Sequence, residues 1–509
     1  MRKLLFALFC LEAIVVQAAV YTTNDVDGIL HRLNVGKAGD VVYVEKGVYD
    51  FTGKVVGDTT TAHFYRKNMP AMLLSGAPGL TRDDVVFTAT DSKSLFSLQN
   101  GRFVVSNLTV RGIAASSAGT FLNRKISGAS GIGNNRPLIT DCVVSNCTSA
   151  GSGGAATCCD ASGSYFYGCE SGASGGALYC QFGNGTANFV PTEVSDCTFV
   201  NCVSTNSGGA CFGGLHRRND FHGCGTRANA STCHGGGVSS AAGCKIYDCS
   251  FYGCFTSGGS SHAAAAQSST VTNCIFIGNK AVGNEIVSCT SPVDCTFIGN
   301  KTSRLFPKAA SLTRCTILSN KLTTVMFDGG GVVVNTLIAN NNLGGCDIAS
   351  APARIYNCTI ANNHGGSTAT TPAHSVLGGG VIAVNTILSG NSPRDISGYK
   401  GTSTGTHCPT MTNCLWTTQN ASNSTTKAVI DQFATNCKAL RNPKFIETGD
   451  HPYMIRSSSP ARDEGYEDEG VRAAVGDQDL AKGTRRMFKA IDIGCYELQK
   501  LPGLMLLVR

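Results

Sequence analysis

The chain has 509 residues, a formal net charge of +7 and only 15% charged residues, with 61 Gly and 25 Cys. Its basic residues are scattered, and the densest patch is His216-Arg217-Arg218. Nucleic-acid binding is therefore not expected, because it needs a clustered basic face. Beyond the amino terminus, no stretch of sequence is apolar over enough residues to span a bilayer.

The amino terminus predicts secretion. Arg2 and Lys3 precede a nearly continuous apolar stretch over residues 4–16, and the small residue Ala18 completes a cleavage site. A signal peptide is therefore expected over residues 1–18. The mature bacterial protein would then be secreted, extracellular or held at the cell surface.

Residues 19–136 are expected to form an amino-terminal cap and the first coils of the fold. Asp25–Leu33 is amphipathic and would cover the open end, and the alternating apolar residues of Gly39–Phe51 predict the first strands. Further strands are expected at Val85–Thr88 and Phe103–Val110, and loops are expected at 54–80 and 113–136.

Residues 137–416 repeat one short sequence word. It is clearest in Val271–Lys280, Val293–Lys301 and Leu312–Lys321, whose central cysteines lie about twenty residues apart. A period in this range predicts a stacked architecture. The central position of the word falls at Cys142, Ser164, Cys197, Asn219, Cys249, Cys274, Cys295, Cys315, Asn335, Cys358, Asn385 and Cys414.

The word has a geometry of its own. An apolar residue lies two positions after each centre, on the same face of a strand, and another usually lies three positions before it. One straight strand cannot point both inward, so the chain must bend between them. Asp141, Asp196 and Asn273 illustrate the Asp or Asn that often precedes the centre, and these residues tolerate a left-handed bend.

A second bend is expected near the position five residues after the centre. Short strands joined by fixed bends, with each coil stacked on the last, predict an all-β fold, a single-domain right-handed parallel β-helix of the pectate-lyase-like kind. The residues at this second position are Cys147, Cys169, Cys202, Cys224, Cys254, Asn279, Asn300, Asn320, Asn340 and Asn363.

A second word, GGA or GGG, accompanies the repeat. It occurs at Gly153, Gly175, Gly208 and Gly235, among others, and would allow tight turns and close backbone stacking. Together with the FxxN word at Phe276–Asn279, it resembles the repeats of polymorphic outer-membrane proteins. That resemblance covers 137–416 and implies right-handed β-helices with a role in adhesion.

Residues 417–509 resemble a different family ending, the terminal module of secreted bacterial β-helix proteins called choice-of-anchor Q. The resemblance rests on Asn442–Phe445, Tyr453, Ser459–Gly465 and Asp492–Glu497. It implies a carboxy-terminal coil and cap module. Cys495 stands where that family usually has Ala.

The cysteines are expected to serve mainly as packing groups. Removing Cys10 with the signal peptide leaves 24 of the 25. Those in inward columns are expected to be free thiols, because stacked parallel side chains are poorly aimed for a disulfide. A zinc site is a further alternative. Cysteines in loops are the better disulfide candidates: Cys158, Cys159, Cys180, Cys211, Cys233, Cys244, Cys346 and Cys408.

One face offers candidate catalytic residues. Asp196, Arg218 and Asp248 should stack in consecutive coils, as the acidic and basic groups of a polysaccharide lyase or hydrolase would. The candidate binding residues lie beside them: His216, Arg217 and His222. The alternative interpretation is a ladder of alternating charges that keeps like charges from stacking.

The terminal module carries charged residues of its own. They could form a metal or glycan site, or a salt-bridged cap that covers strand edges at the last coil. This cluster comprises Asp463, Glu464, Asp477, Asp479, Arg485, Arg486, Asp492 and Glu497.

The pattern favours a non-enzymatic, secreted or surface-associated protein that binds glycans or other cell-surface ligands through loops on a rigid scaffold. A polysaccharide lyase or hydrolase acting on extracellular glycans is the first alternative, and a structural envelope component is the second. No cofactor is expected, although a lyase would call for calcium. The mature chain is expected to be a monomer without a membrane span or a nucleic-acid partner.

Overall fold

The computed structural model describes residues 18–499, and the predicted signal peptide therefore lies almost wholly outside the described residues. The chain forms two compact units, described separately below: 1–259 with 266–268, and 260–265 with 269–509. Within 18–499 the description omits 58–59, 125–135, 181–191, 228–233, 240–243, 258–262, 269, 283–284, 308–309, 325, 328–329, 345–347, 350–351, 366–375, 379, 393, 398–407 and 421–423.

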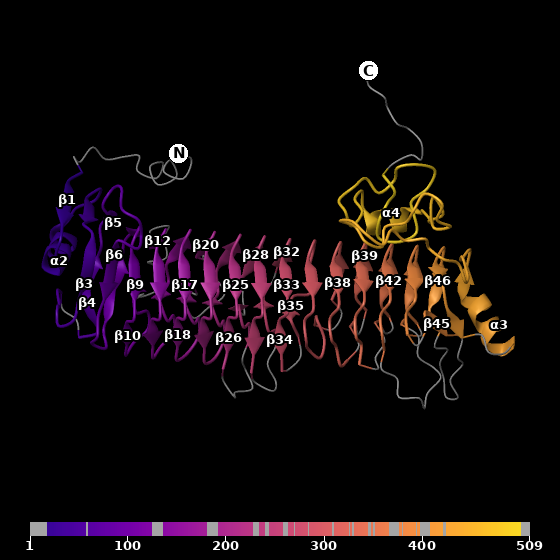
Figure 1. The fold of residues 1–509 in the computed structure, drawn as a ribbon, viewed down its shortest axis with the longest axis horizontal. Helices are drawn as coiled ribbons and strands as arrows, with labels where there is room; N and C mark the ends of the chain where they lie inside the picture. Colours follow the sequence, from indigo (N-terminus) through magenta and orange to yellow (C-terminus); the bar gives the residue numbers. More distant parts are fainter. Residues whose placement is uncertain are drawn as a thin grey trace, which may run out of the picture. The chain divides into compact units, whose positions relative to one another are not determined.

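The first unit is a right-handed parallel β-helix, as predicted. Each coil contributes one short strand to each of several parallel sheets, and every strand pairs with its counterpart in the next coil (Figure 1). Sheet A runs β1 (Val20–Thr23), β2 (Val41–Val44), β5 (Met72–Gly76), β8 (Phe103–Ser106), β12 (Leu138–Thr140), β16 (Asp160–Ser162), β20 (Glu193–Ser195), β24 (Leu215–Arg217) and β28 (Lys245–Tyr247). Sheet B runs β3 (Gly47–Asp50), β6 (Val85–Thr88), β9 (Thr109–Arg111), β13 (Val143–Ser145), β17 (Tyr165–Tyr167), β21 (Thr198–Val200), β25 (Asp220–His222) and β29 (Ser250–Tyr252).

Two further sheets close the coils of this unit. Sheet C runs β4 (Ala62–Asn68), β7 (Ser94–Asn100), β11 (Leu122–Arg124), β15 (Ala156–Thr157), β19 (Leu178–Tyr179), β23 (Cys211–Phe212), β27 (Val238–Ser239) and β31 (Ala266–Gln267). Sheet D runs β10 (Ala114–Ala115), β14 (Thr148–Ser149), β18 (Glu170–Ser171), β22 (Val203–Ser204), β26 (Gly225–Thr226) and β30 (Phe255–Thr256).

An amphipathic helix follows the first strand of the unit, at the place the sequence predicts. Helix α2 (Val26–Val35) is capped by Asp25, whose Oδ1 accepts a hydrogen bond from the backbone N–H of Gly28 at 2.6 Å. Its apolar face buries Ile29, Leu30 and Leu33. The helix contacts β1 and β2, and thereby covers the first coil.

The prediction of loops was wrong for much of 54–80 and for two short parts of 113–136, of which 125–135 lie outside the described residues. Strands β4 and β5 lie in the first range, and β10 and β11 lie in the second. Phe64 and Leu74 are fully buried in the core. These early coils lack the repeated word, so their strands carry too few fixed positions to be recognised by spacing.

The left-handed bends were predicted correctly. Asp141, Asp196 and Asp248 connect sheet A to sheet B with φ of 51°, 55° and 55°. Arg218 adopts the same conformation with φ of 53°, although Arg has no special tolerance for it. Each coil of the repeat therefore turns through a positive-φ residue before its sheet B strand.

The second glycine of the GGA word is required by the neighbouring coil. A Cβ atom on Gly176 would lie 1.9 Å from the carbonyl oxygen of Gly209, and one on Gly154 would lie 2.0 Å from that of Gly176. Both distances are far below a normal contact, and both obstacles are backbone. The coils can stack at this corner only because the position has no side chain.

We expect Gly176→Ala to destabilise the first unit by several kcal/mol, because the added methyl group must push two hydrogen-bonded coils apart. The matched control is Gly253→Asn. A Cβ at Gly253 meets no atom within 4 Å, and Asn tolerates its φ of 61°. Chemical denaturation of both variants measures the difference. Equal midpoints would show that the corner can relax.

The second unit continues the same kind of β-helix, but few of its coils have a strand in sheet C or sheet D. Short columns of isolated bridges replace the remaining sheets, for example from Lys280 through Lys301 to Lys321. Its sheet B strands are β33 (Ile275–Ile277), β36 (Thr296–Ile298), β38 (Thr316–Leu318), β40 (Leu337–Ala339), β42 (Thr359–Ala361), β44 (Ile387–Ser389) and β47 (Leu415–Trp416). Its sheet A strands are β32 (Thr270–Thr272), β37 (Leu312–Thr313), β39 (Val332–Val334), β41 (Arg354–Tyr356), β43 (Ile382–Val384), β46 (Thr410–Thr412) and β49 (Ala434–Thr435). The remaining elements are β34 (Lys280–Ala281), β35 (Val287–Ser288), β45 (Ile396–Ser397), β48 (Gln419–Asn420), α3 (Ser424–Phe433) and α4 (Glu469–Val475).

A ladder of buried asparagines runs through this unit. The side-chain amide of each donates to the Oδ1 of the next and to a backbone carbonyl, for example from Asn300 to Asn320 at 2.9 Å and to Phe276 at 3.0 Å. Asp395 ends the ladder, and its carboxylate accepts five hydrogen bonds. The ladder consists of Asn279, Asn300, Asn320, Asn341, Asn363, Asn391 and Asp395.

The sequence-based register was wrong by one residue in two coils. Thr336 and Thr386, rather than Asn335 and Asn385, occupy the column of central cysteines, because Leu337 pairs with Thr316 and Ile387 pairs with Thr359. Asn341 therefore belongs to the ladder, and Asn340 points outward. The strands of these two coils are apolar on both faces, so alternation could not distinguish inside from outside.

The inward cysteines that the structure describes form no disulfide, as predicted. Burial raises the pKa of Cys254 and of Cys315 to about 12, which keeps them protonated and unreactive. The expectation of disulfides among the loop cysteines is corrected for six of them, which are buried and form no disulfide. These are Cys158, Cys159, Cys180, Cys211, Cys244 and Cys408, whereas Cys233 and Cys346 lie outside the described residues.

Phe297→Asp is expected to unfold the second unit cooperatively. The ring of Phe297 is fully buried and stacks on Phe276 with centroids 4.8 Å apart, so a carboxylate there would be a charge without a partner in the core. Thr296→Asp is the matched control, because Thr296 faces outward on the same strand. Circular dichroism during thermal melting tests both, and a wild-type melting curve for Phe297→Asp would contradict the inward assignment.

Candidate functional site

The structure brings the three candidate catalytic residues to one surface of the first unit. Asp196, Arg218 and Asp248 are exposed at the same bend of successive coils. Arg218 donates two hydrogen bonds to Asp196, from Nε to Oδ1 at 2.8 Å and from Nη2 to Oδ2 at 2.9 Å. Hydrogen bonding to Asp196 raises the pKa of the Arg218 guanidinium, and the charge of Asp248 adds to the effect.

An equivalent Arg–Asp ion pair occurs in the second unit. Arg314 donates to Asp294 in the same two-pronged way, at 2.7 and 3.2 Å, from the equivalent bend. A pair that recurs in another part of the repeat is better explained by the repeat than by a unique reaction centre. The Arg–Asp pair fits a ladder of alternating charges, and the catalytic role of Asp196, Arg218 and Asp248 stays a prediction.

The three candidate binding residues lie in different environments. His216 is fully buried, its Nε2 lies 2.8 Å from the carbonyl oxygen of Gly213, and burial lowers its pKa to about 4. It faces the core and cannot meet an external ligand. Arg217 is exposed and lies over the ring of Tyr247, while His222 stacks on Tyr252 with centroids 4.8 Å apart.

The carboxy-terminal residues after β49 form a module that lies against the strands of the second unit (Figure 1). Val334 and Val384 of sheet A pack outward against Val471 and Val475 of α4. Ala339 and Ala361 of sheet B pack outward against Cys495 and Tyr496. The expected cap over the last coil is therefore corrected, because the module covers an outward side of several coils instead.

Asparagines at the sheet A to sheet B bends hold this module by hydrogen bonds. The amide of Asn335 donates to the carbonyl oxygens of Val475 and Gln478, at 2.7 and 2.9 Å. Asn385 donates to the carbonyl oxygen of Tyr466 at 2.8 Å and accepts from its N–H at 2.6 Å. The left-handed residues of the repeat thus serve a second purpose in these coils.

Buried charged groups order the interior of the module. Arg485 is almost fully buried and donates to the carbonyl oxygens of Asp492 and Gly494. Glu497 is buried nearby, and its carboxylate accepts from the N–H of Asp492 at 2.9 Å. Burial, together with the charge of Asp492, raises the pKa of Glu497 to about 8. Asp479, Arg485, Asp492 and Glu497 therefore lie in the interior of a folded module. The other charged residues of the cluster are exposed or half-buried: Asp463, Glu464, Asp477 and Arg486.

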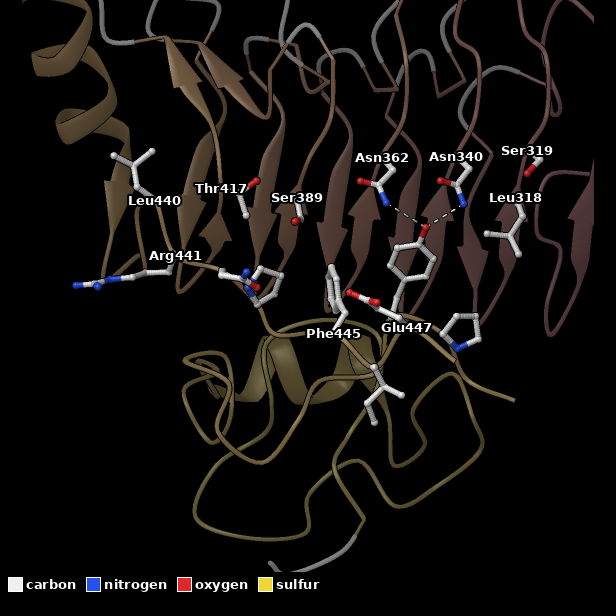
Figure 2. A pocket seen from close by; sticks show the side chains of 15 residues that line it. Leu318, Ser319, Asn340, Asn362, Ser389, Thr417, Leu440, Arg441, Phe445 and Glu447 are labelled. Atoms are coloured by element: carbon white, nitrogen blue, oxygen red, sulfur yellow. Dashed lines mark hydrogen bonds between the residues drawn. The ribbon is translucent and has the colours of Figure 1, made fainter. Parts of the chain in front are cut away.

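A groove of about 770 Å³ lies between the module and the second unit's β-helix, and it is our candidate site (Figure 2). One wall is the outward edge of sheet B, where uncharged polar side chains follow one another from coil to coil. The other wall is the module segment around Phe445. The lining residues are Leu318, Ser319, Asn340, Asn362, Ser389, Thr417, Leu440, Arg441, Asn442, Pro443, Phe445, Ile446, Glu447, Pro452 and Tyr453.

Tyr453 crosses the middle of this groove. Its hydroxyl oxygen accepts hydrogen bonds from the side-chain amides of Asn340 at 2.9 Å and Asn362 at 3.3 Å (Figure 2). The edge of the Phe445 ring supports it, with centroids 5.4 Å apart and planes at 76°. Tyr453 has φ of 71°, an unusual conformation for a bulky residue.

Sequence reasoning missed the groove. Tyr453 and Phe445 were noted only as parts of a family ending, and Asn340 was noted only as a residue near the expected second bend. One signal was available. The bend column after sheet B has Gly278, Gly299 and Gly390 in nearby coils but Asn340 and Asn362 beside the groove, all with positive φ.

The arrangement can bind an extended, hydroxyl-rich molecule. Amides and hydroxyls on one wall donate and accept hydrogen bonds, and aromatic rings on the other offer apolar faces. Within the described residues, no three His, Cys, Asp or Glu side chains converge as a metal-binding group. None of the helices that the structure describes is long and apolar enough to cross a bilayer.

Fold and groove together define a parallel β-helix protein with a side-docked terminal module. No protein-family model and no curated protein sequence matches the chain. Among solved structures, the PL6 family alginate lyase AlyGC shares 12% identity, with 90% of this chain and 58% of its own covered and a TM-score of 0.35. This chain thus spans little more than half of that lyase.

Two other solved structures match the chain at a comparable level. The PL6 family polysaccharide lyase from Pseudopedobacter saltans shares 10% identity, covering 87% of this chain and 98% of its own, with a TM-score of 0.32. The tailspike capsular polysaccharide depolymerase of Acinetobacter baumannii bacteriophage Fri1 shares 10% identity, covering 87% and 63%, with a TM-score of 0.27. At these values no substrate or activity follows for this chain, and the fold rests on its own strand pairing.

The stability of the second unit is expected to fall as the pH rises from about 4.5 to about 8. Over this range the unfolded chain has lost the Glu497 proton, while the folded module retains it. The effect is on the order of a few kcal/mol. Glu497→Gln should flatten the dependence and raise stability above pH 8, whereas the exposed Glu469→Gln should change neither. Melting temperatures from pH 4 to 9 test this, and parallel curves for wild type and Glu497→Gln would contradict it.

Proposed function

We propose that this protein is a secreted or surface-associated, non-enzymatic glycan-binding protein with an adhesin-like role, and that the groove beside Tyr453 is its binding site. The observation that carries the proposal is the lining of the groove. Uncharged hydrogen-bonding side chains repeat along one wall, and Phe445 and Tyr453 stand on the other. Polar groups that fix orientation beside aromatic rings are the usual makeup of a small-molecule or sugar site.

The dimensions of the groove favour an oligosaccharide over a single sugar. The polar wall extends from Ser319 to Thr417 across the strands β38, β40, β42, β44 and β47. Four steps of about 4.8 Å give a length of roughly 19 Å. A chain of linked sugars lying along the coils would meet a similar polar group at each step.

Features of the sequence support both the extracellular location and the adhesin-like role that we propose. The amino-terminal pattern favours export, which would bring the groove into contact with extracellular glycans. The resemblance of residues 137–416 to polymorphic outer-membrane protein repeats favours adhesion. The resemblance of the ending to choice-of-anchor Q modules is consistent with a protein retained at a surface.

The test is a binding screen with a groove-filling variant. The mature chain is incubated with neutral and uronic-acid polysaccharides, and retention is measured by affinity electrophoresis and calorimetry. Ser389→Trp should reduce affinity for the retained glycan at least tenfold, because the indole would occupy the groove floor. Thr296→Trp is the control, since it places the same ring on an outward position outside the groove.

The same screen follows unsaturated products and new reducing ends, with and without calcium. Product formation that disappears in Arg218→Ala or Asp248→Ala would replace this proposal with a polysaccharide lyase. Neither retention nor product on any glycan would favour a structural envelope role. Retention that Ser389→Trp leaves unchanged would place the binding surface elsewhere on the chain.

A further inference from the structure

We infer that the hydroxyl oxygen of Tyr453 occupies the position of a sugar hydroxyl, so that the central subsite of the groove binds an uncharged sugar between Asn340 and Asn362. This inference rests on the proposed function. It names the chemical class of the ligand and the side chain that the ligand displaces.

The geometry at Tyr453 is that of a bound hydroxyl. Two amide groups on adjacent coils donate to one oxygen, at 2.9 and 3.3 Å. Both asparagines are exposed, so these bonds are made at the surface of the coils and not in a core. A sugar hydroxyl has the same acceptor capacity as the tyrosine oxygen and could take its place.

Asparagine is not needed at these positions for folding. The equivalent bend residues in coils of the same unit are Gly278, Gly299 and Gly390, with the same positive φ. A Cβ on Gly278 or Gly299 would meet no atom within 4 Å, so nothing there requires or forbids a side chain. In the second unit, amide groups occur at this bend at Asn340 and Asn362, where they face Tyr453, and the first unit has Asn146 and Asn201 at the same bend.

The backbone at Tyr453 is anchored, because its N–H donates to the carbonyl oxygen of Ile446 at 3.2 Å, so it is the side chain of Tyr453 that a ligand would displace. Phe445 and Ile455 form an antiparallel bridge, and the N–H of Ile446 donates to the carbonyl oxygen of Met454 at 2.7 Å. Residues 447–451, between these anchors, are exposed. The positive φ of Tyr453 costs conformational free energy, so its contacts with the two asparagines help to hold it in this position.

The charges around the groove select an uncharged ligand. The polar wall consists of Ser, Thr and Asn side chains, and the carboxylate of Glu447 is exposed on the module side. A uronic acid at the central subsite would face the carboxylate of Glu447, whereas Arg441 of the groove lining extends away from the polar wall (Figure 2).

The experiment compares Kd values for a retained neutral oligosaccharide and its uronic-acid counterpart. Tyr453→Phe should bind the neutral ligand roughly threefold to tenfold more tightly than wild type, because the ligand no longer displaces two hydrogen bonds. Asn340→Gly combined with Asn362→Gly should weaken binding about tenfold or more, and Tyr453→Phe should have no further effect in that background. Tyr466→Phe is the control, since its hydroxyl bonds to Asp468 in the same module, outside the groove.

The possible outcomes separate the inference from the proposed function. Binding by wild type that Tyr453→Phe leaves unchanged or weakens would overturn the inference, because Tyr453 would then be a module anchor or a direct ligand contact. Preference for the uronic acid would also overturn it. Absence of glycan binding by wild type and by Tyr453→Phe would overturn both. Melting temperatures establish that each variant is folded.

Discussion

The whole structure depends on residues that accept a left-handed backbone on both sides of sheet B. Asp196, Asn273 and Asn357 show the first bend with φ between 49° and 55°, and Asn201, Gly278 and Asn362 show the second with φ between 51° and 64°. These two turns make a short strand possible in every coil. Because Asn and Asp tolerate this conformation better than other residues with side chains, the bends also place polar groups on the surface in register. Charge ladders, module contacts and the groove wall all use that row of side chains.

Inside the second unit, a different constraint governs the stacking. Every buried asparagine has two amide hydrogens and a carbonyl oxygen to satisfy, and an asparagine above it presents the complementary groups. The column must nevertheless end. Asp395 fits the end because a carboxylate has no hydrogens to donate, and it accepts from Asn391, Thr417 and Thr418. A fully satisfied column of this kind fixes the register of the coils as strictly as their backbone hydrogen bonds do.

The parallel β-helix, the left-handed bends and the inward cysteines follow from the spacing of the repeated word, because stacking requires equivalent residues in every coil. The incorrect predictions of loops and of register fall in coils where equivalent positions do not carry recognisable residues. Residues 54–80 have strands without the word, and strands β39 and β43 are apolar on both faces, so their inward side cannot be inferred from alternation. The outward face of these strands is apolar because the terminal module packs against it. A contact between segments more than a hundred residues apart leaves no spacing in the sequence, and the groove formed by that contact could not be predicted.

Under the proposed function, this long-range contact gives a reason for binding at the module and not along the bare repeat. Equivalent side chains recur at every coil, so a repeating surface offers a ligand many equivalent registers and little discrimination between them. The module makes the coils beside it different from the other coils of the repeat. It sets Phe445 and Tyr453 opposite chosen coils of the polar row, so that one register has aromatic faces on one side and amide donors on the other. Selectivity is a difference in affinity between such registers, and it requires a second element that does not repeat. The terminal module supplies that element.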